Sequence, residues 1–135
     1  TKKIEWVKSR LIKAVEALED VCLSEMMMGP AEILAHGDLK RLEIARALAT
    51  DPELLLLDEP FAGMNPVETD FLTKSIRTMH LDGHTMIIVE HKLHALMKLI
   101  QRGIVLHRGE KIAEGKPEEI AKNKKVIEVY MGKAT

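Results

Sequence analysis

The chain of 135 residues is long enough for one domain with its own hydrophobic core. Its net charge of -1 excludes a general attraction to nucleic acid or anionic lipid, and an aromatic content of 3% leaves few rings on which bases stack. The single cysteine, Cys22, has no disulfide partner in the chain, which fits a reducing compartment. The apolar runs are too short to cross a bilayer, and no signal-peptide pattern opens the sequence. We therefore expect no nucleic-acid partner and no direct membrane insertion.

The first part of the chain is predicted to be helical, with a break in its middle. Apolar residues recur every three or four positions over residues 4–19, which indicates an amphipathic helix. Three methionines, residues 26–28, precede a Gly-Pro pair at which the chain breaks. We interpret them as adaptable packing or a partner contact rather than as metal ligands. Residues 38–49 are predicted to form a second helix with Asp38 as its N-cap.

The middle of the chain alternates strand, helix and strand. Residues 53–58 contain four consecutive leucines, and this unbroken apolar run predicts a parallel strand buried on both faces. Asn65 is expected to cap a helix over residues 66–80, because a proline follows it directly and Glu68 lies three positions later. Residues 85–89 are predicted to form a second buried strand. This alternation indicates an α/β fold.

The last part of the chain is predicted to contain a helix, a β-hairpin and two short helices. Residues 92–101 have a helical pattern, and residues 103–107 are expected to be extended. An Arg-Gly pair then turns the chain into a strand over residues 111–113. Short helices are expected from Pro117 and over residues 124–131.

Ionisable side chains follow both predicted parallel strands. Asp58 and Glu59 end the first strand, and Glu90 and His91 end the second, at the edge where open α/β sheets bind ligands. An Asp there can hold Mg²⁺, a Glu can polarise a water and a His can hydrogen-bond a phosphate, which together are parts of a phosphoryl-transfer site. Taken alone, an acidic residue after a strand is often only the first solvated loop residue. A metal site at His91 and His94 is disfavoured, because two histidines need further ligands.

Longer stretches of the sequence resemble one protein family. The segment LAHGDLKRLEIARALATDPELLLLDEPFAGMNPVET is similar to the ABC-transporter ATPase pattern from the signature motif through Walker B to the D-loop. TMIIVEH and then RGIVLHRGEKIAEGKPEEIAKNKKVIEVYMG continue that pattern in order. The D-loop and the C-terminal segment resemble the subfamily that serves branched-chain amino acid transporters and their urea-transport relatives. The resemblance covers about residues 34–132, and residues 1–33 match the preceding helical subdomain loosely.

The resemblance implies a role for each matching residue. Asp58 would be the Walker B ligand of Mg²⁺, Glu59 the general base, and His91 the switch histidine that senses the γ-phosphate. Asn65 would lie in the D-loop, where the two subunits of a dimer meet. In the family the signature loop completes the ATP site of the opposite subunit. Here that loop would supply Ala35, His36, Gly37 and Asp38.

The chain departs from the family pattern at three places. Ala35 replaces the usual serine of the signature motif, so one hydroxyl donor to the γ-phosphate is lost. Lys92 stands where relatives often have Asp, which removes an expected helix cap and puts positive charge at a helix start. The Walker A loop, GxxxxGK[ST], is not found in the sequence. The nearest match, residues 109–117, has the wrong glycine spacing and a final proline, and is interpreted as a hairpin and exit turn.

The implied fold is a partial P-loop NTPase fold of the ABC ATPase type: α/β, with parallel strands and helices, a C-terminal β-hairpin, and no Walker A half. Residues 1–37 would belong to the helical subdomain ending in the signature loop, and residues 38–132 to the C-terminal part of the ATPase core, together forming one compact unit. The Walker A strand would lie beside the strand ending at His91, so its absence leaves an open edge. Re-pairing of the strands, exchange between two copies, and a separate chain carrying the missing half all stay open.

Two functions follow as expectations. The leading one is that the chain is the C-terminal portion of an ABC transporter ATP-binding protein. Full-length relatives of this kind couple Mg-ATP hydrolysis to amino acid import through a membrane permease. Without the phosphate cradle, the chain alone is not expected to hydrolyse ATP. The alternative is a non-enzymatic oligomeric interaction module derived from such an ATPase. ATP and Mg²⁺ are the family's cofactors, and whether the chain alone binds either stays open. The expected partners are a second copy or the missing N-terminal half, and a permease subunit, with a cytoplasmic location peripheral to the inner membrane.

Overall fold

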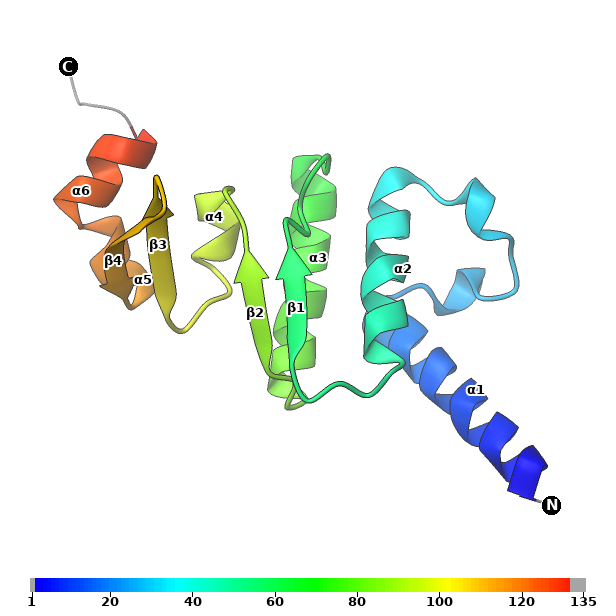
Figure 1. The fold of residues 1–135 in the computed structure, drawn as a ribbon. Helices are drawn as coiled ribbons and strands as arrows, with labels where there is room; N and C mark the ends of the chain where they lie inside the picture. The colour runs from blue at the N-terminus through cyan, green and yellow to red at the C-terminus, as the bar shows by residue number, and fades with distance from the viewer. Residues whose placement is uncertain (1, 132–135) are drawn as a thin grey trace. The chain divides into compact units, whose positions relative to one another are not determined.

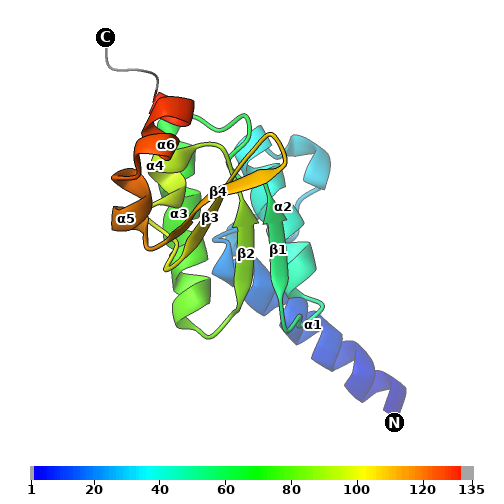
Figure 2. The same ribbon diagram turned by 60° about the vertical axis from the view of Figure 1, so that its left-hand side comes forward.

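The computed structural model describes residues 2–131, so the expected end of the ATPase core at residue 132 lies outside the described part. The chain has the α/β fold expected from its sequence, and it divides into two compact units, Thr1–Ala95 and Leu96–Thr135. A two-stranded parallel sheet packs with helices in the first unit, and an antiparallel hairpin packs with short helices in the second (Figures 1 and 2). The subdomain boundary expected at residue 37 stays a prediction.

The first unit begins with helices and continues as alternating strands and helices. One long helix and two single 3-10 turns come first: α1 (Lys2–Asp20), Ser24–Met26 and Ala31–Ile33. The alternating part comprises α2 (His36–Leu48), β1 (Leu55–Asp58), α3 (Pro66–Leu81), β2 (Met86–Val89) and, at the boundary between the units, α4 (Leu93–Leu96). The expected helices and the two strands of this unit are thereby confirmed, although both strands are shorter than expected.

The sheet of the first unit buries one of its faces. β1 and β2 run parallel, with Leu55 opposite Met86 and Asp58 opposite Val89. α3 lies across one face of this sheet (Figures 1 and 2). On the buried face Leu55 is only 4% exposed. The side chains that are fully buried in this unit form its core: Val21, Phe61, Leu72, Ile76 and Met79.

The opposite face of the sheet is apolar and exposed. Leu54, Leu56, Ile87 and Val89 form this open face, and the last three are 67%, 53% and 58% exposed. The expectation that both faces of these strands are buried is therefore wrong. The consecutive leucines make both faces of the sheet apolar, but no described element of the first unit covers the open face.

α3 begins with the expected capping box. The Asn65 side chain accepts a hydrogen bond from the Glu68 backbone N–H at 3.0 Å, and the Asn65 N–H donates to Glu68 Oε2 at 2.9 Å. Two backbone donors at the helix start are thus satisfied reciprocally, which explains why the helix begins at this point.

α2 begins earlier than expected. Its N-cap is Ala35, which is extended and makes no side-chain capping bond, and the helix starts at His36. Asp38 lies inside the first turn and forms an ion pair with Arg41 one turn later. The expectation that Asp38 caps the helix is wrong, although its negative charge still favours the positive end of the helix dipole.

α1 is anchored only near its C-terminal end. Ala17 is buried, whereas Ile4, Val7 and Leu11, one turn apart on the apolar stripe, are each at least half exposed. Arg10 lies over the ring of Trp6, with 4.9 Å between the guanidinium carbon and the ring centroid. The predicted amphipathic pattern is therefore real, but the first half of its stripe is not packed within this unit.

The second unit is a hairpin with short helices. β3 (Gly103–His107) pairs antiparallel with β4 (Glu110–Gly115). Arg108 and Gly109, with φ values of 51° and 81°, form the two-residue turn between them, as expected for a tight hairpin. α5 (Pro117–Ala121) and α6 (Lys124–Val126) follow, and Ile127–Met131 continue as a single π-helical turn. A small core contains Val105, Ile120 and Val126.

The helix expected over residues 92–101 is shorter in the structure. α4 ends at Leu96, and a single further turn follows, in which the amides of Leu99 and Ile100 both donate to the Leu96 carbonyl. Gly103 then opens β3 in a tight position, since a Cβ there would lie 2.7 Å from the Ile120 side chain. The expectation was wrong in length, because the packing of the following strand outweighs the helical pattern of the sequence.

Candidate functional site

Asp58 and Glu59 lie at the carboxyl end of β1, where the sequence predicted them. Asp58 is the last residue of the strand and is exposed on the same side of the sheet as the open face. Glu59 has a φ of 46°, a left-handed conformation that is uncommon for a residue other than glycine. Its N–H donates to the Val89 carbonyl at 2.8 Å, so the turn is fixed to the end of β2.

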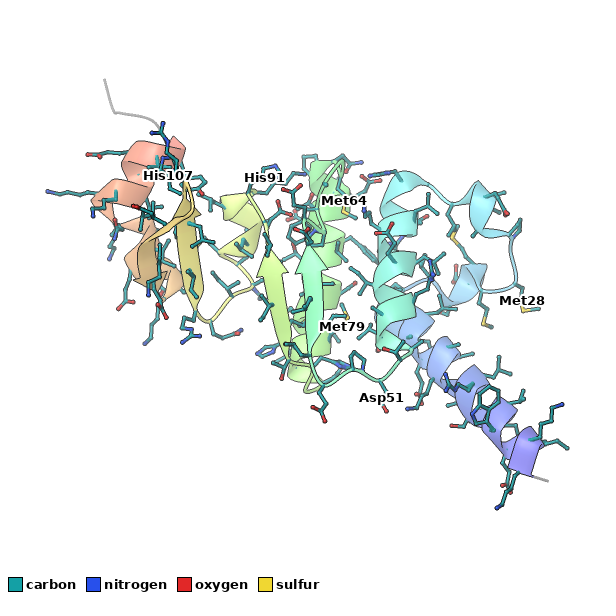
Figure 3. The ribbon with its side chains drawn as sticks, viewed as in Figure 1. Met28, Asp51, Met64, Met79, His91 and His107 are labelled. Atoms are coloured by element: carbon teal, nitrogen blue, oxygen red, sulfur yellow. The ribbon has the colours of Figure 1, made fainter. Side chains whose placement is uncertain are left out.

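Glu59 and His91 meet above the ends of the two strands. His91 Nδ1 lies 3.3 Å from Glu59 Oε1 and 3.4 Å from Glu90 Oε1. The side chains of His91 and Glu59 are 63% and 52% exposed, so both remain accessible to a ligand and to water. Figure 3 shows His91 and Met64 at the same end of the sheet. The structure therefore brings together the predicted base and the predicted switch histidine.

Glu90 is a buried carboxylate at this site, and its interactions were not predicted from the sequence. Its side chain is 0% exposed. Oε1 accepts from the backbone N–H groups of His91 and Lys92 at 2.9 and 3.0 Å, and Oε2 accepts from the N–H of Phe61 at 3.2 Å. A buried carboxylate is tolerated when such donors satisfy it. Its position directly after an apolar strand was the only available sequence signal.

Lys92 links the same two loops as a hydrogen-bond donor, whereas Glu90 links them as an acceptor. Its ammonium group donates to the carbonyls of Phe61 at 2.7 Å and Met64 at 3.2 Å. The sequence suggested a cation placed unfavourably at a helix start. In the structure the charge instead binds two carbonyl oxygens of the loop after β1, and the Lys92 N–H is bound by Glu90.

The loop at the start of α2 packs against the loop after β1. His36 Nε2 lies 3.2 Å from the Ala62 carbonyl oxygen, and a Cβ at Gly63 would lie 2.6 Å from the same His36 nitrogen. Gly37 is buried, and a Cβ there would lie 2.9 Å from Glu68 Oε1. Of the expected nucleotide-binding residues, these contacts bring His36 and Gly37 close to the capping box of Asn65. Ala35 and Asp38 flank them in sequence.

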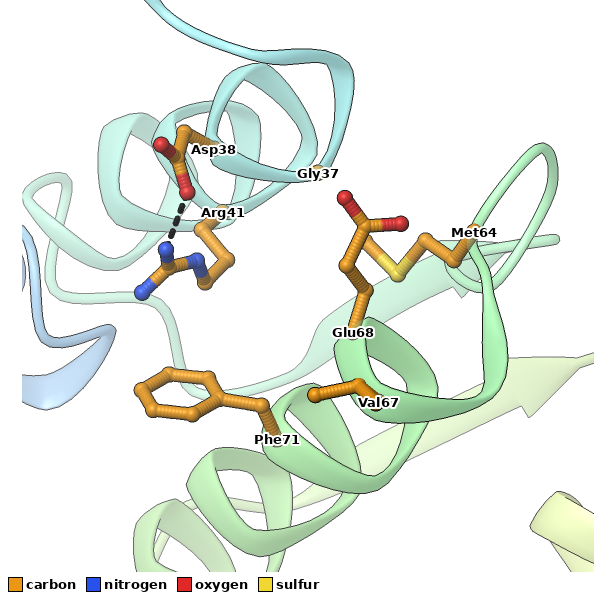
Figure 4. Close-up of a pocket in the computed structure, with 7 residues that line it drawn as sticks. All are labelled: Gly37, Asp38, Arg41, Met64, Val67, Glu68 and Phe71. Carbon is orange, nitrogen blue, oxygen red and sulfur yellow. Dashed lines mark hydrogen bonds and ion pairs between the residues drawn. The ribbon is translucent and has the colours of Figure 1, made fainter.

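A shallow pocket of about 180 Å³ lies between the first turns of α2 and α3 (Figure 4). Arg41 lines this pocket. Its guanidinium carbon lies 4.6 Å from the Phe71 ring centroid, and its Nη1 donates to the carbonyls of Val21 and Cys22 at 3.0 and 3.2 Å. These bonds tie α2 to the end of α1, so the main role of Arg41 is to join helices. The lining residues are Gly37, Asp38, Arg41, Met64, Val67, Glu68 and Phe71, and none is a strand-end carboxylate.

A second hollow, of about 140 Å³, is partly lined by Asp58 and by Lys40 and Glu43 of α2. Within residues 2–131, no group of three or more His, Cys, Asp or Glu side chains is arranged to hold a metal. Mg²⁺ usually takes one or two protein carboxylates and completes its shell with water and substrate phosphate. The exposed Asp58 carboxylate fits that mode, and a site built from protein ligands alone does not fit.

Two known families match the sequence of the chain. Residues 4–62 match the family described as ABC transporter, and residues 110–135 match the branched-chain amino acid ATP-binding cassette transporter family. The first match contains the loop before α2 and the two carboxylates at the end of β1, and the second contains β4 and the short helices that follow. Within the described part, no helix is long and apolar enough to span a membrane.

Curated relatives of the chain are transport ATP-binding proteins. The chain is 42% identical over 127 residues to the high-affinity branched-chain amino acid transport ATP-binding protein LivG of Escherichia coli K12, covering 92% of the chain and 49% of that protein. It is 40% identical over 122 residues to the corresponding protein BraF of Pseudomonas aeruginosa, covering 90% and 48%. The chain therefore spans about half the length of the curated relatives it matches.

Solved structures give the same result. An ATP-binding cassette of an ABC transporter in its ADP conformation superposes with a TM-score of 0.82 at 32% identity, covering 92% of this chain and 50% of that one. A nucleotide-free cassette superposes with a TM-score of 0.80 at 31% identity, covering 92% and 51%. The fold and the sequence thus point to the same proteins.

Proposed function

Because the chain belongs to the ABC transporter ATP-binding family, we propose that it forms part of an ATP-binding subunit whose Mg-ATP hydrolysis drives amino acid import. The names of LivG and BraF, which are branched-chain amino acid transport proteins, support this class of solute. The partner in this proposal is a membrane permease, and the location is the cytoplasmic side of the inner membrane.

The observation that carries the proposal is the contact between Glu59 and His91 beside Asp58, at the ends of two parallel strands. Asp58 would hold the metal, since its carboxylate is exposed there. Glu59 would orient and deprotonate the attacking water, and His91 would hydrogen-bond the terminal phosphate. Bound Mg-ATP would supply the phosphoryl group and the cation that neutralises it.

The signature loop and the D-loop would complete an ATP site in a second subunit. Gly37 lets the Glu68 carboxyl group pack against this loop, and the positive end of the α2 helix dipole lies in the same loop. Ala35 supplies no hydroxyl, so backbone donors would carry the phosphate contacts. Asn65 would lie at the contact between subunits while it caps α3.

The chain alone is proposed to be inactive. No GxxxxGK[ST] loop occurs in the printed sequence, and positioning of the phosphates is most of phosphoryl-transfer catalysis. Turnover would therefore need a phosphate-binding loop from another segment or chain. Calorimetric titration of the purified chain with Mg-ATP should then show no saturable heat.

The test of the proposed roles is a chimera in which this chain replaces the matching half of Escherichia coli LivG. We expect the purified chimera to hydrolyse ATP, and we expect Glu59→Gln to lower kcat by at least about 100-fold, the usual scale for loss of a general base. Glu53→Gln, at an exposed residue two positions before β1, is the matched control and should leave kcat unchanged. A chimera whose kcat is insensitive to Glu59→Gln would refute the role of Glu59.

A second candidate function is a non-enzymatic oligomeric module. The open face favours it, because a contiguous apolar face is the kind of surface that associates. Sedimentation of the chain distinguishes the two candidates: a stable oligomer that binds no nucleotide, and that Leu56→Glu dissociates, would favour the module.

A further inference from the structure

Glu90 and Lys92 both act on one short segment, the loop that leaves β1. Glu90 Oε2 accepts the N–H of Phe61, and the Lys92 ammonium donates to the carbonyl of the same Phe61. The two side chains flank His91 in the sequence. The peptide groups on both sides of Phe61 are thus held from the loop that leaves β2, by one anion and one cation.

We propose that Glu90 and Lys92 are positioning residues, which fix the loop after β1 to the loop after β2 and thereby hold Glu59 and His91 in contact. The inference rests on the proposed function only for the purpose of the contact between Glu59 and His91. The fixing of the two loops by Glu90 and Lys92 does not depend on that function.

The geometry of Glu90 requires both of its oxygens. Oε1 serves the loop after β2, through the N–H groups of His91 and Lys92, and Oε2 serves the loop after β1, through Phe61. A glutamine has one acceptor oxygen in place of two, so Glu90→Gln must leave one loop without its acceptor. The side chain is 0% exposed, so water does not readily replace the lost bond.

Glu59 needs this support because of its backbone. A left-handed conformation at a residue other than glycine persists when its surroundings hold it in place. Glu59 is held by its own N–H bond to Val89 and by the Ala62 N–H, which donates to its carbonyl at 3.0 Å. Phe61 lies between these two bonds, so a loop released at Phe61 lets the Glu59 carboxylate leave His91 Nδ1.

If Glu90 and Lys92 had a purely structural role, their substitution would change stability alone. If they are positioning residues, their substitution also changes the tautomer of the His91 ring. Glu59 and Glu90 both face Nδ1, at 3.3 and 3.4 Å, and therefore favour the neutral tautomer that carries its proton on Nδ1. Lys92 binds carbonyls of the neighbouring loop. A change in the His91 tautomer caused by Lys92 would therefore travel through that loop.

The experiment is side-chain ¹⁵N NMR of His91 in the purified chain at about pH 8, above the ordinary histidine range. We expect the wild type to show mainly the Nδ1–H form, and Lys92→Met to shift the population towards Nε2–H. Lys92→Arg should restore it at least partly, and Lys74→Met, on the exposed side of α3, should have no effect. In Glu90→Gln, amide hydrogen exchange should accelerate about tenfold in the loop that loses its acceptor, which means at Phe61 or at His91 and Lys92.

An unchanged His91 tautomer in a folded Lys92→Met variant would overturn the inference, even if the melting temperature fell. If Lys92→Met does not fold, Lys92→Gln, which keeps a donor NH2 group on a shorter, uncharged side chain, should give a smaller shift of the same sign. An inactive LivG chimera combined with the expected NMR shift would refute the proposed function and leave the positioning intact.

Discussion

Gly63→Ala tests the packing between the loop at the start of α2 and the loop after β1. Gly63 has a φ of 72°, and an added Cβ would lie 2.6 Å from His36 Nε2. Gly83, in the same unit, has a φ of 102° and open space around its Cβ position. The pair separates backbone strain, which both substitutions cause, from collision, which only one causes.

The magnitude follows from two contributions. Backbone strain of an alanine in the left-handed region costs about 1–2 kcal/mol at either glycine. At Gly63 the His36 ring must also move and lose its bond to the Ala62 carbonyl, which adds about 1 kcal/mol. We therefore expect Gly63→Ala to lower the free energy of unfolding by about 2–3 kcal/mol, and Gly83→Ala by about 1–2 kcal/mol.

The assay is urea unfolding of the purified chain followed by circular dichroism, in a double-mutant cycle with His36→Ala. In that background the ring is gone, so Gly63→Ala should cost only its strain, and the coupling energy should be about 1 kcal/mol. Gly83→Ala should cost the same with or without His36. A Gly63→Ala cost equal to that of Gly83→Ala, or a coupling energy near zero, would refute the described contact.

Three further predictions concern the cap, the open face and one ion pair. Asn65→Ala should lower the free energy of unfolding by about 1 kcal/mol and Asn65→Ser by much less, because serine also accepts a bond at a helix N-cap; urea titration measures both. Leu56→Glu should change stability by less than about 0.5 kcal/mol, whereas Leu57→Glu, on the buried face, should unfold the chain, as circular dichroism will show. Lys13 donates a hydrogen bond to Asp51 and holds the pKa of that carboxyl below its ordinary value. The pair therefore stabilises the fold at pH values above the ordinary pKa of Asp, and this stabilisation is lost as the pH falls through the lowered pKa. Lys13→Met should return the pKa of Asp51 to its ordinary value in a carboxyl ¹³C titration, and an unshifted titration would contradict the pairing.

Features written in a few adjacent residues could be predicted from the sequence. The Asn65 cap depends on a proline and a glutamate within three positions, and the hairpin turn depends on Arg108 and Gly109 alone. Chemistry confined to one turn needs no knowledge of the rest of the fold. The strand ends were predictable for a similar reason, since Asp58 and Glu59 directly follow an apolar run.

Features that depend on distant residues were missed. The earlier start of α2 involves His36 and the Ala62 carbonyl, and the interactions of Glu90 and Lys92 involve Phe61, about thirty positions away. Burial of a strand also depends on what lies above it. Leucines predict an apolar face, but they do not say whether a partner covers it, and Leu56 is 67% exposed.

The open face has a consequence for the life of the chain in a cell. Three of its four aliphatic side chains lie on two short strands whose outer edges are unpaired among the elements of the first unit, the kind of surface on which chains aggregate. Chaperones and proteases act on proteins that expose such surfaces. The abundance of the chain should therefore track the supply of whatever covers that face, so that uncovered copies are removed and assembly regulates its own stoichiometry.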